Sequence, residues 1–250
     1  MKNFMRNFLD GMRVETHNEL DQFTRPASSL EVGNFRPSNA PNSSYIGDVK
    51  LQKRGDIWPE FHGKPLWPLA QLNLTTAPFR PNGLQDIEMI TIFVSEYFME
   101  MAGNVVNSHE YAPVGGWYLR AYPRMSDLED FIAPEHDSPI KATEARWRKY
   151  ALGDHPTLAI SGQSITDQSR EDPIEEIEFD SVQGTKLGGW PNCLQSPPWW
   201  EQQQSDFEYV LQLDSMPEAE WIWGEGGTAF IARSKKDPDR WALDYQFSGR

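Results

Sequence analysis

The sequence has a single cysteine, Cys193, so it cannot form an intramolecular disulfide, and nothing in it indicates an oxidising compartment. It also lacks a run of about 20 apolar residues, the length that a membrane-spanning helix needs. Near its start, Asp10, Arg13 and Glu15 interrupt the apolar residues, a pattern that does not fit a signal peptide. We therefore expect a cytoplasmic protein that has no membrane partner.

Motifs for catalysis or metal binding are missing as well. The five histidines are scattered without the paired spacing of an HExxH zinc site, and no GxSxG sequence marks a serine nucleophile. Gly63-Lys64 is followed by Pro65, where a phosphate-binding loop needs serine or threonine, and residues 224–227 are glycine-rich but precede an apolar strand rather than a helix. We expect no metal and no cofactor, and a non-catalytic protein is favoured over an enzyme.

Positive charge is scarce. The chain has 37 Asp and Glu residues against 23 Lys and Arg residues, which gives a formal net charge of −14. A direct nucleic-acid partner is not expected, because binding one requires cations that neutralise phosphates. The acidic excess suits steering toward a basic protein, and it also suits solubility alone.

The acidic residues are densest between positions 171 and 180. Six of these ten residues are acidic: Glu171, Asp172, Glu175, Glu176, Glu178 and Asp180. Ile174, Ile177 and Phe179 interrupt the charges, so we expect this segment to fold against the body of the protein. It is either a solvated acidic face or a docking patch for a basic partner.

What the sequence does contain is a faint internal repeat. Residues 44–94 align with residues 185–235 at a constant shift of 141 positions, without a gap. The matching pairs are Gly47 and Gly188, Trp58 and Trp199, Leu66 and Phe207, Gln71 and Gln212, Leu72 and Leu213, and Gly83 and Gly224. We interpret the alignment as a divergent duplication that predicts one pseudo-symmetric unit.

Each copy includes a short apolar strand that carries a glutamine. A buried amide left without partners costs roughly 1–3 kcal/mol, so Gln71 and Gln212 must be hydrogen-bonded. In one interpretation each glutamine ties down an adjacent loop. In the other, Gln71, Asn73, Gln212 and Asp214 line a ligand cleft between the copies, which would suit an enzyme or a small-ligand-binding protein.

The remaining segments indicate short strands and few helices. Nineteen prolines and eighteen glycines favour strands and loops over long helices. Buried or alternating apolar residues predict strands within 87–101, 115–122 and 240–247. Apolar spacing predicts an N-terminal helix in residues 1–23, and the proline-, serine- and asparagine-rich segment 24–44 is predicted to be a connector. We therefore divide the chain into an N-terminal segment, 1–43, and a domain, 44–250.

A series of short motifs resembles the YwqG-like family, a bacterial family of unknown function. These motifs are Gly47, Trp58-Pro59, Gly63-Lys64-Pro65-Leu66 and Leu69–Leu74 in the first copy, and Lys186–Pro191 with Gln195, Leu211–Asp214 and Trp223–Gly227 in the second. Asp48 departs from the family pattern, in which a second glycine usually follows Gly47. The resemblance covers about residues 44–247 and implies an α+β fold with extensive antiparallel sheet and no established catalytic residues.

The resemblance also implies a role in protein binding. Members of such families occur beside genes for secreted toxins, where the neighbouring protein neutralises the toxin. We therefore expect an immunity protein that binds a basic bacterial toxin such as a nuclease, with the acidic run 171–180 as the contact surface.

Overall fold

The computed structural model describes residues 24–98, 105–108, 116–159, 176–180, 182–194 and 197–247. Strands dominate this part of the chain. Its helical elements are α2 (Trp199–Gln202) and the 3-10 turns η1 (Leu74–Thr76), η2 (Asn82–Leu84), η3 (Met125–Asp127) and η4 (Pro217–Ala219). The predicted α+β class is therefore wrong, because the described chain is a β protein. The helix predicted for residues 1–23 lies outside the described residues.

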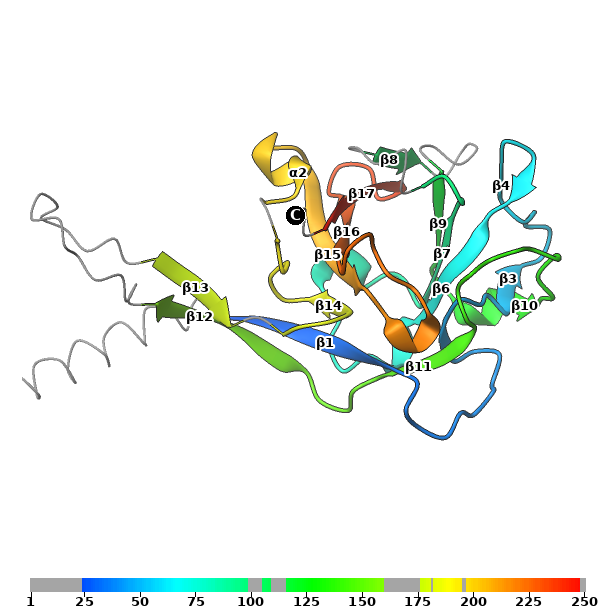
Figure 1. Ribbon diagram of the computed structural model, residues 1–250, viewed down its shortest axis with the longest axis horizontal. Helices are drawn as coiled ribbons and strands as arrows, with labels where there is room; N and C mark the ends of the chain where they lie inside the picture. Colours follow the sequence, from blue (N-terminus) through cyan, green and yellow to red (C-terminus); the bar gives the residue numbers. More distant parts are fainter. Residues whose placement is uncertain are drawn as a thin grey trace, which may run out of the picture.

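The described strands form one large antiparallel sheet of 13 strands (Figure 1). Its main path runs β8-β17-β16-β15-β14-β1-β11-β2-β6-β7-β9, and β8 also approaches β9, so the sheet is nearly closed into a barrel. The strands on this path are β1 (Arg25–Val32), β2 (Ser44–Ile46), β6 (Trp67–Asn73), β7 (Met89–Val94), β8 (Val105–Ser108), β9 (Trp117–Tyr122), β11 (Thr143–Trp147), β14 (Lys186–Gly188), β15 (Phe207–Asp214), β16 (Thr228–Ser234) and β17 (Arg240–Gln246).

The strand order is symmetric about the β1–β11 pair. Outward from this pair, β14, β15, β16 and β17 on one side correspond to β2, β6, β7 and β9 on the other. Glu31 pairs with Arg146 at the centre, and their side chains form an ion pair with 2.8 Å between the Arg146 Nε and Glu31 Oε2 atoms. β1 thus joins the second half of the sheet through β14, although it precedes the first half in the sequence.

The register of the two halves repeats as well. Pro68 pairs with Phe93 in the first half, and Tyr209 pairs with Ala232 in the second. Pro68 and Tyr209 are 141 positions apart, which is the shift of the sequence repeat. Phe93 and Ala232 are 139 positions apart, so the second strand of the pair is shifted by two residues less. Both ladders have an irregularity at the same place, directly after Pro68 and Tyr209. The repeat therefore extends from the sequence to the strand pairing.

The connector predicted for residues 24–44 is wrong for residues 25–32, which form the central strand β1. The small residues Ala27, Ser28 and Ser29 are buried and pair with β14 on one side. On the other side, Ala27 pairs with Leu152 at the start of β12 (Leu152–Ala159). Ser28 satisfies its hydroxyl by donating to the Phe79 carbonyl at 2.7 Å and accepting from the Phe79 N–H at 2.8 Å. These polar residues are therefore compatible with a buried strand because they have partners.

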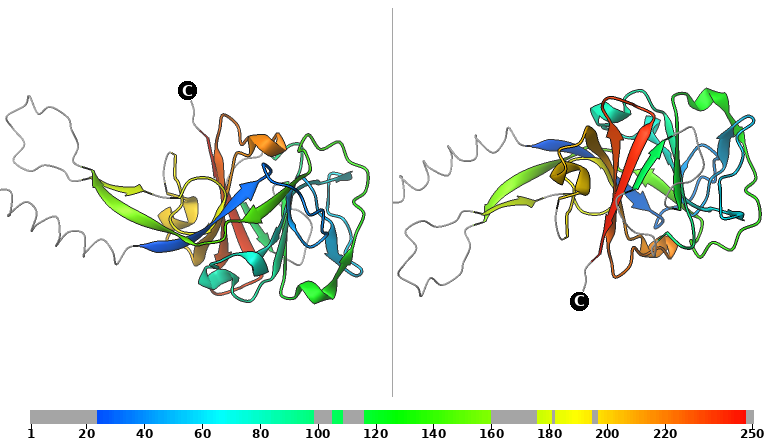
Figure 2. Two further views of the ribbon diagram at one scale, coloured as in Figure 1. Left: turned by 90° about the horizontal axis from the view of Figure 1, so that it is seen from below. Right: turned by 90° about the horizontal axis from the view of Figure 1, so that it is seen from above.

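A two-stranded arm projects from the body of the molecule (Figures 1 and 2). It consists of β12 (Leu152–Ala159) and β13 (Glu176–Asp180), and β12 continues into the main sheet by pairing with the start of β1. Among the described strands, β13 pairs only with β12. The expectation that the acidic run folds against the body is therefore wrong for residues 176–180, since their backbone pairs within the hairpin.

Two small sheets and a continuous apolar core complete the fold. The small sheets are β3 (Leu51–Lys53) with β10 (Leu128–Asp130), and β4 (Glu60–Phe61) with β5 (Lys64–Pro65). The largest buried cluster combines residues of both halves, such as Leu72, Ile90, Leu211 and Leu213. One core therefore supports both halves. Among the described residues, no helix has the length and apolar content needed to cross a membrane.

A fully buried glutamine holds the loops beside the first half-sheet. The Gln71 Oε1 atom accepts hydrogen bonds from the backbone N–H groups of Lys50 and Leu51, at 2.9 and 3.0 Å. Its Nε2 atom donates to the carbonyls of Pro41 and Ser43, both at 2.8 Å. All four hydrogen-bonding positions of this amide are therefore used.

The second half repeats this arrangement with Gln212. Its Oε1 atom accepts from the Asn192 N–H at 2.9 Å, and its Nε2 atom donates to the Gly184 carbonyl at 3.0 Å and to Asn192 Oδ1 at 2.7 Å. In the sequence repeat, Gly184 and Asn192 align with Ser43 and Leu51. Both glutamines thus bond to adjacent loops, as the first of the two interpretations of the sequence predicts.

We predict that Gln71→Ala lowers the free energy of unfolding by about 3 kcal/mol, because it leaves several buried backbone groups without partners. Urea unfolding followed by tryptophan fluorescence measures the change. Gln203→Ala is the matched control, since Gln203 is exposed, and it should change stability by less than about 0.5 kcal/mol. A Gln71→Ala effect as small as the control would contradict the role assigned to this amide.

Candidate functional site

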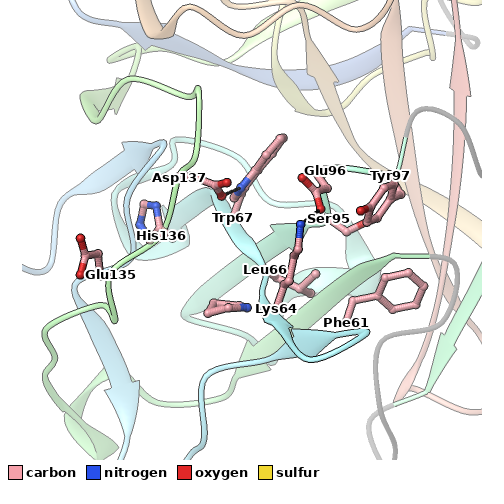
Figure 3. Close-up of a pocket in the computed structure, with 11 residues that line it drawn as sticks. Phe61, Lys64, Leu66, Trp67, Ser95, Glu96, Tyr97, Glu135, His136 and Asp137 are labelled. Atoms are coloured by element: carbon pink, nitrogen blue, oxygen red, sulfur yellow. Dashed lines mark hydrogen bonds and ion pairs between the residues drawn. The ribbon is translucent and has the colours of Figure 1, made fainter.

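A pocket of about 400 Å³ opens beside β5 in the first half of the protein (Figure 3). We call it the carboxylate pocket. Three segments line it, 61–67, 95–97 and 135–137. They supply three carboxylates, Glu96, Glu135 and Asp137, together with aromatic side chains and one lysine. A pocket of this size is within the range that holds a small ligand or one extended side chain.

The β4–β5 hairpin positions Lys64 in this pocket. The hairpin turns at His62 and Gly63, whose φ angles of 52° and 74° lie in the left-handed region, where glycine is favoured. Phe61 pairs with Lys64 across the turn. The short hairpin thus presents the lysine ammonium to Glu96 at the end of β7.

An aromatic stack supports the third wall. The Trp58 indole N–H donates to the Leu66 carbonyl at 2.9 Å. The Trp58 ring packs edge-on against Phe93, with centroids 4.9 Å apart, and stacks with Phe131 at 5.7 Å and with His136 at 6.3 Å. These contacts fix the loop that carries residues 135–137 against the body of the protein.

Two of the carboxylates are held in their charged form by specific donors. The Trp67 indole Nε1 donates to Asp137 Oδ1 at 3.0 Å, and this hydrogen bond lowers the pKa of Asp137. Lys64 Nζ forms a hydrogen-bonded ion pair with Glu96 Oε1, which lowers the pKa of Glu96 and raises the pKa of Lys64. Both carboxylates therefore stay ionised at neutral pH.

The charge balance of the pocket favours a cationic ligand. Three carboxylates and one lysine line the pocket, so its lining has a net negative charge near neutral pH. Among the described residues, no group of three or more His, Cys, Asp or Glu side chains is close enough to hold a metal ion. The negative charge and the aromatic lining suit an organic cation that can contact the rings.

A second cavity, of about 600 Å³, lies beside β2 and β11 and has a mixed lining. Its charged groups already contact other protein groups: Lys50 Nζ lies 3.8 Å from Asp48 Oδ2, and the Glu144 carboxylate accepts from the Ser38 hydroxyl at 2.6 Å and the Asn39 N–H at 2.8 Å. This cavity offers a weaker binding site, because its polar groups compensate one another.

The four residues predicted to form a ligand cleft bond to separate loops. Four strands lie between β6 and β15 in the sheet order, so Gln71 and Gln212 belong to different parts of the sheet. Asn73 donates to the Asn42 carbonyl at 2.7 Å. Asp214 accepts from the Thr228 hydroxyl at 2.8 Å. Each of the four side chains thus has at least one local hydrogen-bond partner.

The acidic run 171–180 is described only in part. Glu176, Glu178 and Asp180 occupy alternate positions of β13 on the projecting arm. Glu171, Asp172 and Glu175 lie outside the described residues. The arm and the carboxylate pocket are thus two separate acidic features.

The single cysteine, Cys193, is exposed, and its surroundings raise the pKa of its thiol. Restricted solvation of its sulfur raises the pKa of Cys193 to about 12, and the carboxylates of Glu201 and Asp244 act in the same direction. The thiolate, which is the reactive form, is therefore scarce at neutral pH.

Sequence reasoning missed the pocket residues as a group. Lys64 stands out only as part of a short motif, and no pattern in the sequence marks Trp67, Glu96 or Asp137. The three lining segments are distant in the sequence, and no spacing rule connects them. The density of Lys, Pro and aromatic residues in 58–67 is the available signal, and it indicates an ordered turn rather than a pocket.

The sequence model of a protein family described as a domain of unknown function, DUF1963, matches residues 44–242 of the chain. The match spans both halves of the sheet and every segment of the carboxylate pocket. No curated protein matches the chain.

We predict that Trp67→Phe raises the pKa of Asp137, because phenylalanine keeps an aromatic ring but cannot donate the hydrogen bond that lowers this pKa. Carboxyl-detected NMR titration of both proteins measures the change. The pKa of Asp206, which is lowered mainly by the Ser234 hydroxyl in the other half, serves as the internal control. An unchanged Asp137 pKa would show that the indole does not set it.

Proposed function

We propose that this chain, which belongs to the DUF1963 family, is a non-catalytic binding protein for a basic protein partner. The observation that carries the proposal is the carboxylate pocket, where acidic side chains and the exposed ring of Tyr97 line one opening. Such a mixture is typical of protein-binding surfaces.

Ile57 and Ile132 are two further exposed apolar side chains. They are 80% and 91% exposed, the highest values among the large apolar side chains that the structure describes. Ile57 precedes Trp58 and Ile132 follows Phe131, and the rings of Trp58 and Phe131 stack on each other. Each isoleucine is therefore the sequence neighbour of a ring in the stack that supports the pocket. Large apolar side chains that are this exposed favour a contact with another protein.

The charge of the protein supports a basic partner. The formal net charge is −14, and Glu96, Glu135 and Asp137 add negative charge at the pocket. Charges of this kind accelerate the encounter with an oppositely charged protein and align it at the surface. The projecting arm, whose strand β13 has an acidic sequence, adds to the negative charge available to a partner.

The resemblance to the YwqG-like family refines the proposal. We propose that the chain is a bacterial, cytoplasmic immunity protein that occludes a basic toxin such as a nuclease. The acidic run of Glu171, Asp172, Glu175, Glu176, Glu178 and Asp180 is the proposed second contact for the toxin. An inhibitor of this kind needs only to cover the functional surface of the toxin, so it requires no catalytic groups.

The test is binding to the catalytically inactivated product of the adjacent gene, measured by calorimetry at several salt concentrations. We expect a complex that weakens as salt rises, because exposed charges are screened. Ile132→Asp should weaken it at least about tenfold, since it places a charge in the apolar contact. Glu135→Lys should slow association about threefold or more.

Asp239→Lys is the matched control for the second variant. Asp239 is exposed in the loop between β16 and β17, and its substitution changes the net charge by the same amount away from the pocket. The proposal fails if the gene product does not bind or if cells that make the active product gain no protection from the chain. Equal effects of Glu135→Lys and Asp239→Lys would place the contact elsewhere.

A further inference from the structure

Ser95 carries a buried hydroxyl that has no hydrogen-bond partner among the described residues. The residue is 7% exposed and lines the carboxylate pocket. Its backbone is fixed, because the Ser95 N–H donates to the Gly116 carbonyl at 2.6 Å. A buried hydroxyl in this state costs free energy, so a group that bonds to it from the pocket would gain binding free energy.

The other half of the protein provides an internal reference. Phe93 of β7 and Ala232 of β16 occupy equivalent positions in the two ladders, so Ser95 is equivalent to Ser234. Ser234 is fully bonded: its hydroxyl donates to Asp206 Oδ2 and accepts from the N–H groups of Lys236 and Asp237, at 3.2 and 2.9 Å. The same position is thus satisfied in one half and open in the other.

Ser95 and Ser234 differ because the residue that accepts the hydrogen bond from Ser234 is replaced in the first half. Asp206, which accepts from Ser234, aligns with Pro65 in the sequence repeat. Proline has neither a side-chain acceptor nor an N–H donor. Ser95 therefore lines a pocket in which the described part of the chain supplies no replacement for Asp206.

We propose that the carboxylate pocket binds a primary alkylammonium group, with the Ser95 hydroxyl, Glu96 and Asp137 as its acceptors. An ammonium group has three N–H donors, which matches three acceptors. Because the pocket has a net negative charge, it should bind a cation more tightly than an anion, although Lys64 is present. Where the ligand is a lysine of a basic protein, this inference rests on the proposed function.

The walls of the pocket fit the alkyl part of such a ligand. Phe61, Trp67 and Tyr97 line it, so methylene groups can pack on aromatic surface while the charged end reaches the carboxylates (Figure 3). Lys64 already contacts Glu96 in the free protein. It therefore competes with the ligand for this carboxylate.

The experiment titrates the labelled protein with Nα-acetyl-lysine methylamide and follows the Trp67 indole N–H signal by NMR. We expect saturable shifts with a Kd of roughly 1 mM, typical of a single small group. The Nε-acetylated form of the same compound, which has no charge, is the matched control and should not bind. Cadaverine distinguishes the source of the ammonium: tighter binding of cadaverine assigns the pocket to a free diamine, and weaker binding to a protein lysine.

Three variants test the acceptors. Ser95→Ala should weaken ammonium binding about tenfold without lowering Tm, because the free protein loses only an unpartnered hydroxyl. Ser234→Ala is its control: it should lower Tm and leave the affinity unchanged. Asp137→Asn should also weaken binding about tenfold or more. Lys64→Met should tighten ammonium binding, because it removes the competitor for Glu96, whereas an anion site would lose affinity.

The inference is overturned if the acetylated compound binds as well as the charged one, if Lys64→Met weakens binding, or if no shift occurs. Its failure is separable from that of the proposed function. A partner complex that Ile132→Asp disrupts but Ser95→Ala and Asp137→Asn do not affect leaves the function standing without the ammonium site. If the chain binds the ammonium compound but no basic protein, the ammonium site stands and the proposed function fails.

Discussion

One buried glutamine in each half holds the structure in its observed form. A glutamine at the centre of β6 or β15 is buried among apolar side chains, where an unpaired amide would be costly. The loops must therefore bring backbone groups to it, and the same loop positions do so in both halves. The amide thereby fixes where each loop crosses the end of its sheet, and the short strands β2 and β14 follow directly from those loops.

The two half-sheets repeat one frame of strands and glutamine-held loops, but they differ at the position occupied by Asp206 in one half and Pro65 in the other. In the second half, Asp206 and the turn at 236–237 bond to Ser234 and close the end of the sheet. In the first half, Pro65 replaces the acid, and the chain instead brings Trp67, Glu96 and Asp137 to an open pocket. The frame contributes stability, and the departure from it contributes the pocket that is the candidate site. This division agrees with a general pattern in which local departures from an ideal structure mark functional positions.

The strands were predictable where the sequence carries a strong local pattern. The apolar run 87–101 contains β7, and the alternating segments at 115–122 and 240–247 contain β9 and β17. β1 was missed because small polar residues do not indicate a buried strand, and their partner at Phe79 is far away in the sequence. The pocket was missed for the same reason: its acids and aromatic residues are ordinary in sequence, and only the fold of the chain brings three segments together. Gln71 and Gln212 were identifiable because the repeat marked them.

A crystal structure of the protein grown with a lysine-rich peptide tests the central claim most directly. The account predicts a lysine ammonium within hydrogen-bond distance of Ser95 Oγ and Asp137, beside an unchanged pair of glutamine-held half-sheets. It would be contradicted by a structure in which a group of the protein itself bonds to Ser95 and closes the pocket, with the peptide bound elsewhere.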